Sequence, residues 1–527
     1  MATYLSETIL EDDNKTYTAD RASPVLIHML QSGNLLTRKA AFKSLLQISS
    51  YHPNGKILVD AGIVQIMVEE MFNKQIQNES MDSVREASAI LANILESGAF
   101  GLAFENLPAT KQGHAMASGY VVFNIIYMIR NSIPDDLNLN LIRILTCLIK
   151  STKSAAPVVA AVKESDASYT LVEFLNNPSH EIATTAIKLL TLLSPHIGHL
   201  LIERLCKTNG LPESLIQSPA DPGQITERQA LSVSFLAKLP HQNLTLNMAL
   251  LSKNTVPEVI ESINRVLKGG ARQNRYTQSY LEGLVGVLVR FTATLYDSQM
   301  LFLAINHNFT TMFTDLVAET SSDEVLRLAA TGLEKLSSQS IHLTQPPKLK
   351  RKRFLNPFCL PEYLASCSSR KIQIQLCPVH KGVCSKQDTC CLIEAKAVPR
   401  LLACLDHQNV EVVESALSAL STLLDDKVDV DQSVNLLNDM NATQKVLKAV
   451  RHHRNESLWQ KAFWMIERFL LKGGQRSISL VSQDKMFAVS VVTAFHHGEA
   501  YTRQMAEKIL RYLDKMPSLS ATTTFTI

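Results

Sequence analysis

The residues best suited to chemistry form a short segment rich in cysteine and histidine in the second half of the chain. It reads Cys377-Pro-Val-His380-Lys-Gly-Val-Cys384-Ser-Lys-Gln-Asp-Thr-Cys390, and seven of the nine cysteines lie between residues 359 and 404. Thiolate sulfur and imidazole nitrogen are the ligands that zinc takes in structural sites, but such sites usually show two closely spaced cysteine pairs. We therefore favour reduced thiols packed where a loop meets a helix. Cys377, His380, Cys384 and Cys390 remain the candidate zinc ligands, and no cofactor is expected.

The sequence contains none of the common catalytic signatures. The phosphate-binding Gly-x-x-x-x-Gly-Lys-Ser/Thr, the dinucleotide-binding Gly-x-Gly-x-x-Gly, the hydrolase Gly-x-Ser-x-Gly and the metalloprotease His-Glu-x-x-His are all missing. Serine, histidine and aspartate residues are plentiful, but no spacing groups them. We expect no active site in this sequence and leave open whether the whole protein is an enzyme.

A basic run, Lys348-Leu-Lys-Arg-Lys-Arg353, lies among Pro346, Pro347, Pro357 and Pro361. Proline clusters are typical of loops. We interpret residues 341–376 as a basic, Pro- and Cys-bearing loop inserted in the fold. The run itself is compatible with a solvated loop, which we favour, with a nuclear import signal, or with contact to an anionic membrane surface.

The composition limits the class of protein. Of 527 residues, 46% are hydrophobic, 19% are charged and only 6% are aromatic, and the net charge is +3. This excludes a dominantly disordered chain and a histone-like nucleic-acid binder, and it favours long helices over many strands. The acidic start and the lack of a long uncharged apolar window predict a cytoplasmic protein, peripheral at the plasma membrane or nuclear as alternatives.

One pattern organises the chain: a small or apolar residue followed by apolar residues four and seven positions later. Neighbouring copies begin 44 to 54 residues apart, except for 87 between Ala329 and Ala416, which indicates either a degenerate repeat or an insertion. These offsets place the residues in one stripe of a helix, which a single helix cannot bury alone. The clear copies are Ala41/Leu45/Ile48, Ala87/Leu91/Ile94, Leu141/Leu145/Leu148, Ala186/Leu190/Leu193, Ala329/Leu333/Leu336, Ala416/Leu420/Leu423, Ala462/Ile466/Phe469 and Ala506/Leu510/Leu513, and two blurred copies begin at Ala230 and Leu284.

Ahead of these strings, pairs of short apolar helices are separated by a turn that favours positive φ, as at Gly62, Gly210 and Asn254, with Lys396 departing from the rule. Three helices per unit of about 45 residues predict an all-α, right-handed armadillo-type solenoid of ten to eleven repeats, with HEAT repeats as the near alternative. We expect an N-terminal tail over 1–20, repeats over 21–340 and 377–516, and a C-terminal tail over 517–527.

In such an array the third helix of each unit is expected to line the concave groove. Positions two and six of each string point away from its buried stripe, and seven of these twenty residues are basic while none is acidic. This suggests a groove that binds an acidic or phosphorylated protein segment. The candidate groove residues are Lys43, Asn93, Arg143, Lys188, Arg290, Lys335, Trp464, Arg468, Lys508 and Tyr512.

Five strings in the last third of the chain carry a family resemblance: Cys377 to Ser385, Leu392-Ile-Glu-Ala, Leu405-Asp-His, Val410 to Asp426 and His497 to Pro517. They closely resemble the armadillo region of plant U-box proteins, in particular the large U-box ubiquitin ligases connected with senescence and immunity. The resemblance is strong from about residue 377 to 517, and weaker but collinear from about 24 to 340.

The resemblance implies an E3 ubiquitin ligase whose U-box recruits a ubiquitin-loaded E2, while the armadillo array binds a substrate or regulator and can hold the protein at the plasma membrane. The Ile-Cys-Pro-Ile-type opening and the Asp-Pro-Val segment of a U-box have no counterpart in this sequence, so no catalytic or E2-contact residue is carried over. We expect a protein-binding scaffold with protein partners and no nucleic acid. The alternatives are a ligase whose U-box lies outside this sequence and a peripheral membrane scaffold.

Overall fold

The computed structural model describes residues 12–32, 34–72, 81–98, 106–131, 134–208, 210–219, 224–251, 254–269, 274–344, 376–384 and 390–514. Across these ranges the secondary structure is helical, with isolated bridges such as Pro108 to Ala115 and no β-strand. The all-α prediction is confirmed. The chain divides into unit 1, residues 1–255 with 274–283, and unit 2, residues 256–273 with 284–527.

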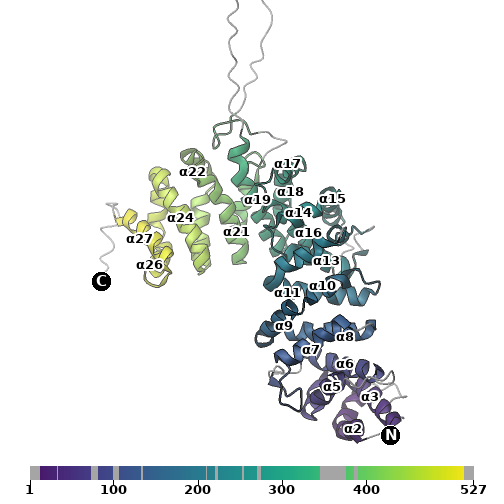
Figure 1. Cartoon of the computed structure of the whole chain (residues 1–527). Helices are drawn as coiled ribbons and strands as arrows, with labels where there is room; N and C mark the ends of the chain where they lie inside the picture. Colours follow the sequence, from purple (N-terminus) through teal and green to yellow (C-terminus); the bar gives the residue numbers. More distant parts are fainter. Residues whose placement is uncertain are drawn as a thin grey trace, which may run out of the picture. The chain divides into compact units, whose positions relative to one another are not determined.

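Unit 1 holds the helices from α2 to α14 and the first turns of α16 (Figure 1). Its helices are α2 (Asp12–Ser32), α3 (Leu35–Ser49), α4 (Gly55–Asp60), α5 (Ile63–Phe72), α6 (Met81–Glu96), α7 (Gly119–Asn131), α8 (Asp135–Lys150), α9 (Thr152–Glu164), α10 (Ala167–Glu173), α11 (His180–Lys207), α12 (Leu211–Ser214), α13 (Glu227–Lys238) and α14 (Leu244–Leu250), with 3-10 turns η1 (His52–Asn54) and η4 (Phe174–Asn176).

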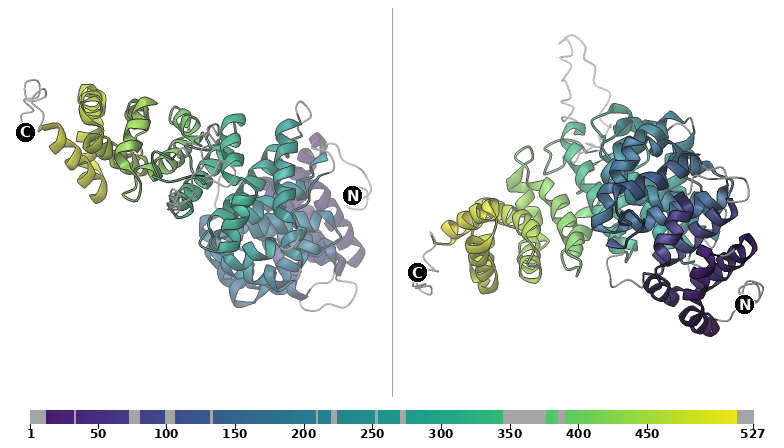
Figure 2. Two further views of the ribbon diagram at one scale, coloured as in Figure 1. Left: turned by 90° about the horizontal axis from the view of Figure 1, so that it is seen from above. Right: turned by 60° about the horizontal axis from the view of Figure 1, so that its bottom comes forward.

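Unit 2 holds nearly all of α15, the end of α16 and the helices that follow, which succeed one another in chain order in Figure 2. Its helices are α15 (Thr255–Lys268), α16 (Thr277–Thr292), α17 (Ser298–Asn306), α18 (Phe309–Glu319), α19 (Asp323–Leu343), α20 (Ala397–Cys404), α21 (Val410–Ser421), α22 (Val430–Asp439), α23 (Ala442–His452), α24 (Glu456–Lys472), α25 (Gly474–Gln483), α26 (Lys485–His497) and α27 (Ala500–Asp514), with the 3-10 turn η6 (Thr422–Leu424).

Every predicted stripe begins on the third helix of a repeat, and one of them ends at Leu423 on η6, directly after α21. Seven of the eight clear copies are buried at all three positions. The exception is the last copy, on α27, where Leu510 is half-buried. Successive third helices from α3 to α13 and from α19 to α27 pack on each other, so each of these helices hides its stripe against a neighbouring copy. The third helices are α3, α6, α8, α11 and α13 in unit 1, α19, α21, α24 and α27 in unit 2, and α16, which begins in unit 1 and ends in unit 2.

The turn before the second helix adopts the left-handed backbone conformation that the sequence indicates. Gly62 has φ of 81°, Gly210 has 77° and Asn254 has 54°. Lys396 takes the same conformation, with φ of 56°, although a side chain makes it unfavourable. The departure at Lys396 is therefore one of residue type and not of backbone path.

The first helix begins earlier than the sequence indicates. Residues 1–20 were expected to form a tail, whereas α2 begins at Asp12. Ala19 is fully buried, and Ala22, Leu26 and Leu30 continue its face at helical spacing. The short alanine side chains at the start of this face give a weak apolar signal, so the sequence alone does not indicate the first turns of α2.

The double interval is an insertion and not a hidden repeat. Helix α19 packs directly on α21, and Asn409 Nδ2 donates a hydrogen bond to Asp323 Oδ2 at 2.8 Å. The basic run 348–353 and most of the predicted insertion lie outside the described residues. The end of that insertion is described from Leu376, where Cys377 is already buried in unit 2.

One described helix, α11, is long and apolar enough to cross a membrane, and the bent pair α25 and α26 meets the same criterion only if it is counted as one span. More than half of the most apolar stretch of α11 is buried inside unit 1, as in the core helix of a packed repeat.

Candidate functional site

Three of the four candidate zinc ligands meet in unit 2. Nδ1 of His380 lies 3.4 Å from Cys377 Sγ and 3.4 Å from Cys384 Sγ. The fourth member is Cys391, whose Sγ lies 3.9 Å from that of Cys377. The four ligand atoms all lie within 4.8 Å of one another. We call these four residues the Cys3His cluster.

Cys390 does not belong to the cluster, which corrects the ligand set suggested by spacing. Its side chain hydrogen-bonds Thr310 on α18, and burial raises its pKa to about 12. Cys390 and Cys391 are neighbours in an irregular turn, so their side chains leave the backbone in different directions. Both residues are buried cysteines, and the sequence carries no signal that distinguishes them.

The first three ligands sit on a tight turn. Cys377 N–H donates to Gly382 C=O at 2.7 Å, and Lys381 N–H donates to Cys377 C=O at 3.0 Å. Pro378 restricts φ early in the turn, and Lys381 has φ of 55°. This compact geometry brings Cys377 and His380 side by side despite the two residues between them.

Ser340 on α19 orients the histidine ring. Its hydroxyl donates to Ser337 C=O at 2.6 Å, so it accepts from His380 Nε2–H at 2.8 Å. That arrangement leaves Nδ1 as the ring nitrogen that faces the sulfur atoms. Burial disfavours the charged imidazole, but hydrogen bonds with Cys377 and Cys384 raise the pKa of His380 to about 9.

The pKa values of the two most buried thiols of the cluster, Cys377 and Cys391, are shifted in opposite directions. Hydrogen bonds from Cys384 and Cys391, opposed by burial, lower the pKa of Cys377. Hydrogen bonding with Cys377 and Cys384, together with burial, raises the pKa of Cys391. The cluster therefore favours a negative charge on Cys377 beside a cationic partner.

The candidate groove residues of unit 1 lie on third helices, as predicted. Arg143 on α8 donates to Glu96 at 2.6 and 3.0 Å and to Asn93 Oδ1 at 2.8 Å. Lys188 on α11 pairs with Glu227 on α13 at 2.7 Å. Lys43 on α3 is exposed. The basic residues at this face are thus bonded to carboxylates of the neighbouring third helix in two of the three cases.

In unit 2 the same pattern recurs. Arg468 pairs with Asp426 at 2.6 Å, and its guanidinium stacks 5.1 Å from the ring centroid of half-buried Trp464. Lys508 on α27 pairs with Glu467 on α24 at 3.3 Å. Lys335 and Tyr512 are half-buried on α19 and α27.

Arg290 does not line a groove. Its side chain is fully buried, as is every residue from 283 to 292. Because this part of α16 is buried on all sides, it has no exposed face, and the helical period cannot be used to place Arg290 at a surface. The prediction for Arg290 is corrected accordingly.

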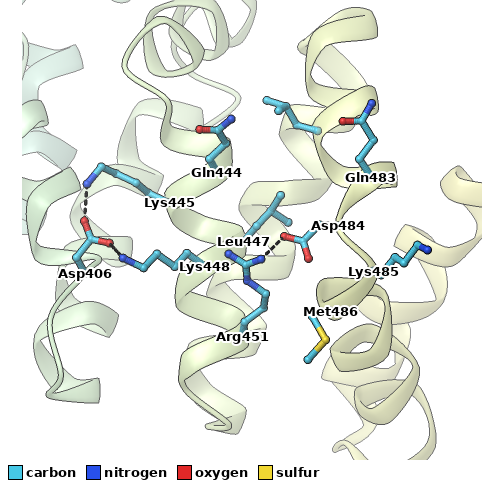
Figure 3. A pocket seen from close by; sticks show the side chains of 11 residues that line it. Asp406, Gln444, Lys445, Leu447, Lys448, Arg451, Gln483, Asp484, Lys485 and Met486 are labelled. Atoms are coloured by element: carbon cyan, nitrogen blue, oxygen red, sulfur yellow. Dashed lines mark hydrogen bonds and ion pairs between the residues drawn. The ribbon is translucent and has the colours of Figure 1, made fainter.

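A charged pocket of about 770 Å³ lies in unit 2 beside second helices, away from the predicted groove positions. Figure 3 shows Lys445 and Lys448 of α23 both directed at Asp406, and Arg451 directed at Asp484, with ion pairs at 2.6, 2.6 and 3.0 Å. Four basic and two acidic side chains line the pocket. The sequence analysis considered only third helices and therefore did not predict this pocket.

Comparison with known proteins gives a consistent result. Residues 391–425 match the model of the Armadillo/beta-catenin-like repeat. The chain is 53% identical over 520 residues to the putative U-box domain-containing protein 42 of Arabidopsis thaliana, with 99% of this chain and 50% of that protein covered. It is 31% identical over 525 residues to the U-box domain-containing protein 44 of the same plant, covering 99% of this chain and 63% of that protein.

The chain is a homologue of plant U-box domain-containing proteins. The resemblance found in the sequence is therefore confirmed, and the protein is an armadillo-repeat scaffold related to them. The chain spans about half the length of the first of these relatives and 63% of the second. An engineered protein solved by the Northeast Structural Genomics Consortium shares the fold, with a TM-score of 0.58 at 15% identity over 94% of this chain and 99% of that protein.

Proposed function

We propose that this armadillo-repeat homologue recognises a substrate or regulator protein through the face formed by its third helices. The proposal rests on the arrangement around Trp464 and Arg468 on α24. A half-buried tryptophan stacked with an arginine is the kind of side-chain pair that contributes most to protein binding. Unit 2 offers this pair on α24, inside a row of third helices that runs from α19 to α27.

The preferred partner is an extended segment bearing carboxylates or phosphates. Arg468 already bonds Asp426, whose side chain is 76% exposed. An exposed ion pair of this kind contributes only about 0.2 to 1 kcal/mol, so a partner anion can replace Asp426 at little cost. Phosphate adds a bidentate geometry that the guanidinium favours. The basic residues are thus held in place by weak internal partners until the segment binds.

Binding of peptide pools to the full chain tests this proposal. Acidic, phosphorylated and neutral pools are titrated in a Trp459→Phe background, in which Trp464 is the remaining tryptophan and reports by fluorescence. We expect binding of the acidic or phosphorylated pool that is lost in Arg468→Glu with Lys508→Glu. Arg476→Glu on α25 reverses an exposed charge elsewhere in the unit and should leave binding unchanged. Equal binding by all variants would refute the proposal.

In this proposal the chain supplies the substrate-binding function of an E3 ubiquitin ligase. The support is the name of the relatives, and this chain covers only part of their length. An in vitro reaction with E1, E2 and the 527-residue chain separates scaffold from ligase. Autoubiquitination by the purified chain would contradict a scaffold role without catalysis.

A cytoplasmic location, with the plasma membrane surface or the nucleus as alternatives, stays a prediction. The pocket around Lys445, Lys448 and Arg451 offers a local basic surface for anionic headgroups. Sedimentation with vesicles rich in phosphatidylserine at low and high salt checks the membrane alternative. Failure to pellet at low salt would remove it.

A further inference from the structure

We propose that Cys377, His380, Cys384 and Cys391 bind one structural zinc ion. The four residues come from two separate stretches of an irregular segment, and their ligand atoms converge on one point. All four lie in unit 2, next to the end of α19 and the start of α20.

The spacing of the ligand atoms fits tetrahedral zinc. With Zn–S bonds of about 2.3 Å and a Zn–N bond of about 2.0 Å, the edges of a tetrahedron measure about 3.5 to 3.8 Å. Two of the S to N separations are 3.4 Å, the Cys377 to Cys391 sulfur separation is 3.9 Å, and no two ligand atoms lie more than 4.8 Å apart. A metal ion therefore fits among these atoms with only small movements of the side chains.

The surroundings of His380 supply a second, independent observation. A histidine that binds zinc through one nitrogen usually donates a hydrogen bond from the other, which fixes the tautomer and the ring orientation. Ser340 accepts such a bond from Nε2, because its own hydroxyl proton is given to Ser337 C=O. Nδ1 is the ring nitrogen that faces the sulfur atoms, and zinc binding there releases its proton. Three soft thiolates and one imidazole select zinc over magnesium or calcium.

Two other interpretations of the cluster are weaker. A cysteine and histidine pair acting as a nucleophile must reach a substrate, but Cys377 is only 2% exposed and Cys391 is fully buried. A disulfide requires sulfur atoms about 2.05 Å apart, and it would leave His380 and Cys384 without a role in the cluster. Zinc binding explains all four residues together.

A zinc ion at this site would stabilise a repeat that has little regular structure before α20. In the repeat of α20 and α21, the described residues before α20 form turns, whereas the repeats that end in α19, α24 and α27 have a first helix there. The segment is joined to α19 by the contact of Thr344 Oγ1 with Cys384 Sγ at 3.8 Å, and to α22 by the Lys381 to Asp429 ion pair at 3.1 Å. A metal that closes a long loop stabilises a segment with little regular structure of its own.

The experiment compares adjacent cysteines in the full chain. Protein is produced with zinc in the medium, dialysed against metal-free buffer, and analysed for metal by inductively coupled plasma mass spectrometry. We expect one zinc ion per wild-type chain and per Cys390→Ser chain, and at least a fivefold lower content in Cys391→Ser. Both residues are buried, so the pair separates loss of a ligand from loss of a packed thiol.

Cobalt replacement and a conservative variant keep the test informative if Cys391→Ser folds poorly. Co²⁺ added to metal-free protein should give the intense visible absorption of a tetrahedral thiolate site, and zinc should abolish it. Cys384→Ser, at a half-buried ligand, should lose this spectrum, whereas His380→Cys should retain tetrahedral binding with four sulfurs. Circular dichroism confirms that each variant is helical.

Three results would overturn the proposal. These are a metal content near zero in the helical wild-type chain, equal zinc in Cys390→Ser and Cys391→Ser, and a Cys377 to Cys391 disulfide found by mass spectrometry after purification under reducing conditions. A zinc chelator should also lower the melting temperature of the wild type but not that of Cys384→Ser.

Discussion

Ser337 Oγ and Thr422 Oγ1 lie 2.6 Å apart although 85 residues separate them in the chain. Thr422 gives its hydroxyl proton to Ala419 C=O at 2.7 Å, so Ser337 is the donor of the bond between the two side chains. The bond joins the end of α19 to η6, directly after α21. It adds a side-chain link between neighbouring repeats to the packing of α19 on α21.

This bond can be measured with a double-mutant cycle. Ser337 is 3% exposed, so Ser337→Ala and Thr422→Val should each lower stability and should couple by about 0.5 to 1.5 kcal/mol. The double variant should be less destabilised than the sum of the single variants. Thermal unfolding of the four proteins provides the data, and additive effects would show that the bond is not formed in solution.

Substitutions at two equivalent left-handed turns, Gly62→Ala and Lys396→Gly, should change the stability in opposite directions. Nothing lies within 4 Å of a Cβ built on Gly62, so Gly62→Ala adds only backbone strain and should cost about 1 to 2 kcal/mol. Lys396→Gly removes the same strain but loosens the unfolded chain, for a net gain of about 0.5 kcal/mol. Melting temperatures test both. A loss of stability in Lys396→Gly would indicate that the lysine side chain makes a stabilising contact.

Arg143 should be more important for unit 1 than an ordinary surface arginine. Its guanidinium bonds Glu96 on α6 and also the amide oxygens of Asn93 and Asn140. Arg143→Ala should destabilise by about 1 to 2 kcal/mol, and Arg143→Lys by nearly as much, because an ammonium cannot keep the forked geometry. Arg130→Ala, at an exposed site on α7, is the control and should change stability by less than about 0.5 kcal/mol. Denaturant titration distinguishes these outcomes.

The pocket in unit 2 predicts a pH dependence. Hydrogen bonds from Lys445 and Lys448 hold the pKa of Asp406 below its ordinary value of 3.8. Because the folded pKa is lowered, Asp406 contributes stability above its ordinary pKa and loses it as the pH falls through the lowered value. The difference in melting temperature between wild type and Asp406→Asn should therefore be constant from about pH 7 to 5 and shrink below about pH 4. A difference that grows on acidification would contradict this assignment.

Much of the fold could be predicted because a solenoid is built from local signals. The stripe that includes Ala462, Ile466 and Phe469 lies on one helix and is fully buried, as its spacing indicates. Lys396 illustrates the limit of residue type, because its backbone adopts positive φ although a lysine side chain gives no signal for that conformation. The sequence did not predict features that depend on neighbouring helices, such as the burial of Arg290 near the end of α16.

The amino-acid sequence by itself determined the helical repeat, its period and the family to which it is related, because each apolar stripe is set by residues within two helical turns and the same local pattern recurs along the chain. The tertiary structure decided which groups meet. It selected Cys391 over Cys390, placed Ser340 behind His380, and paired Arg468 with Asp426. Such choices depend on side-chain direction in turns and on neighbours some 40 residues away, and no spacing along the chain encodes them.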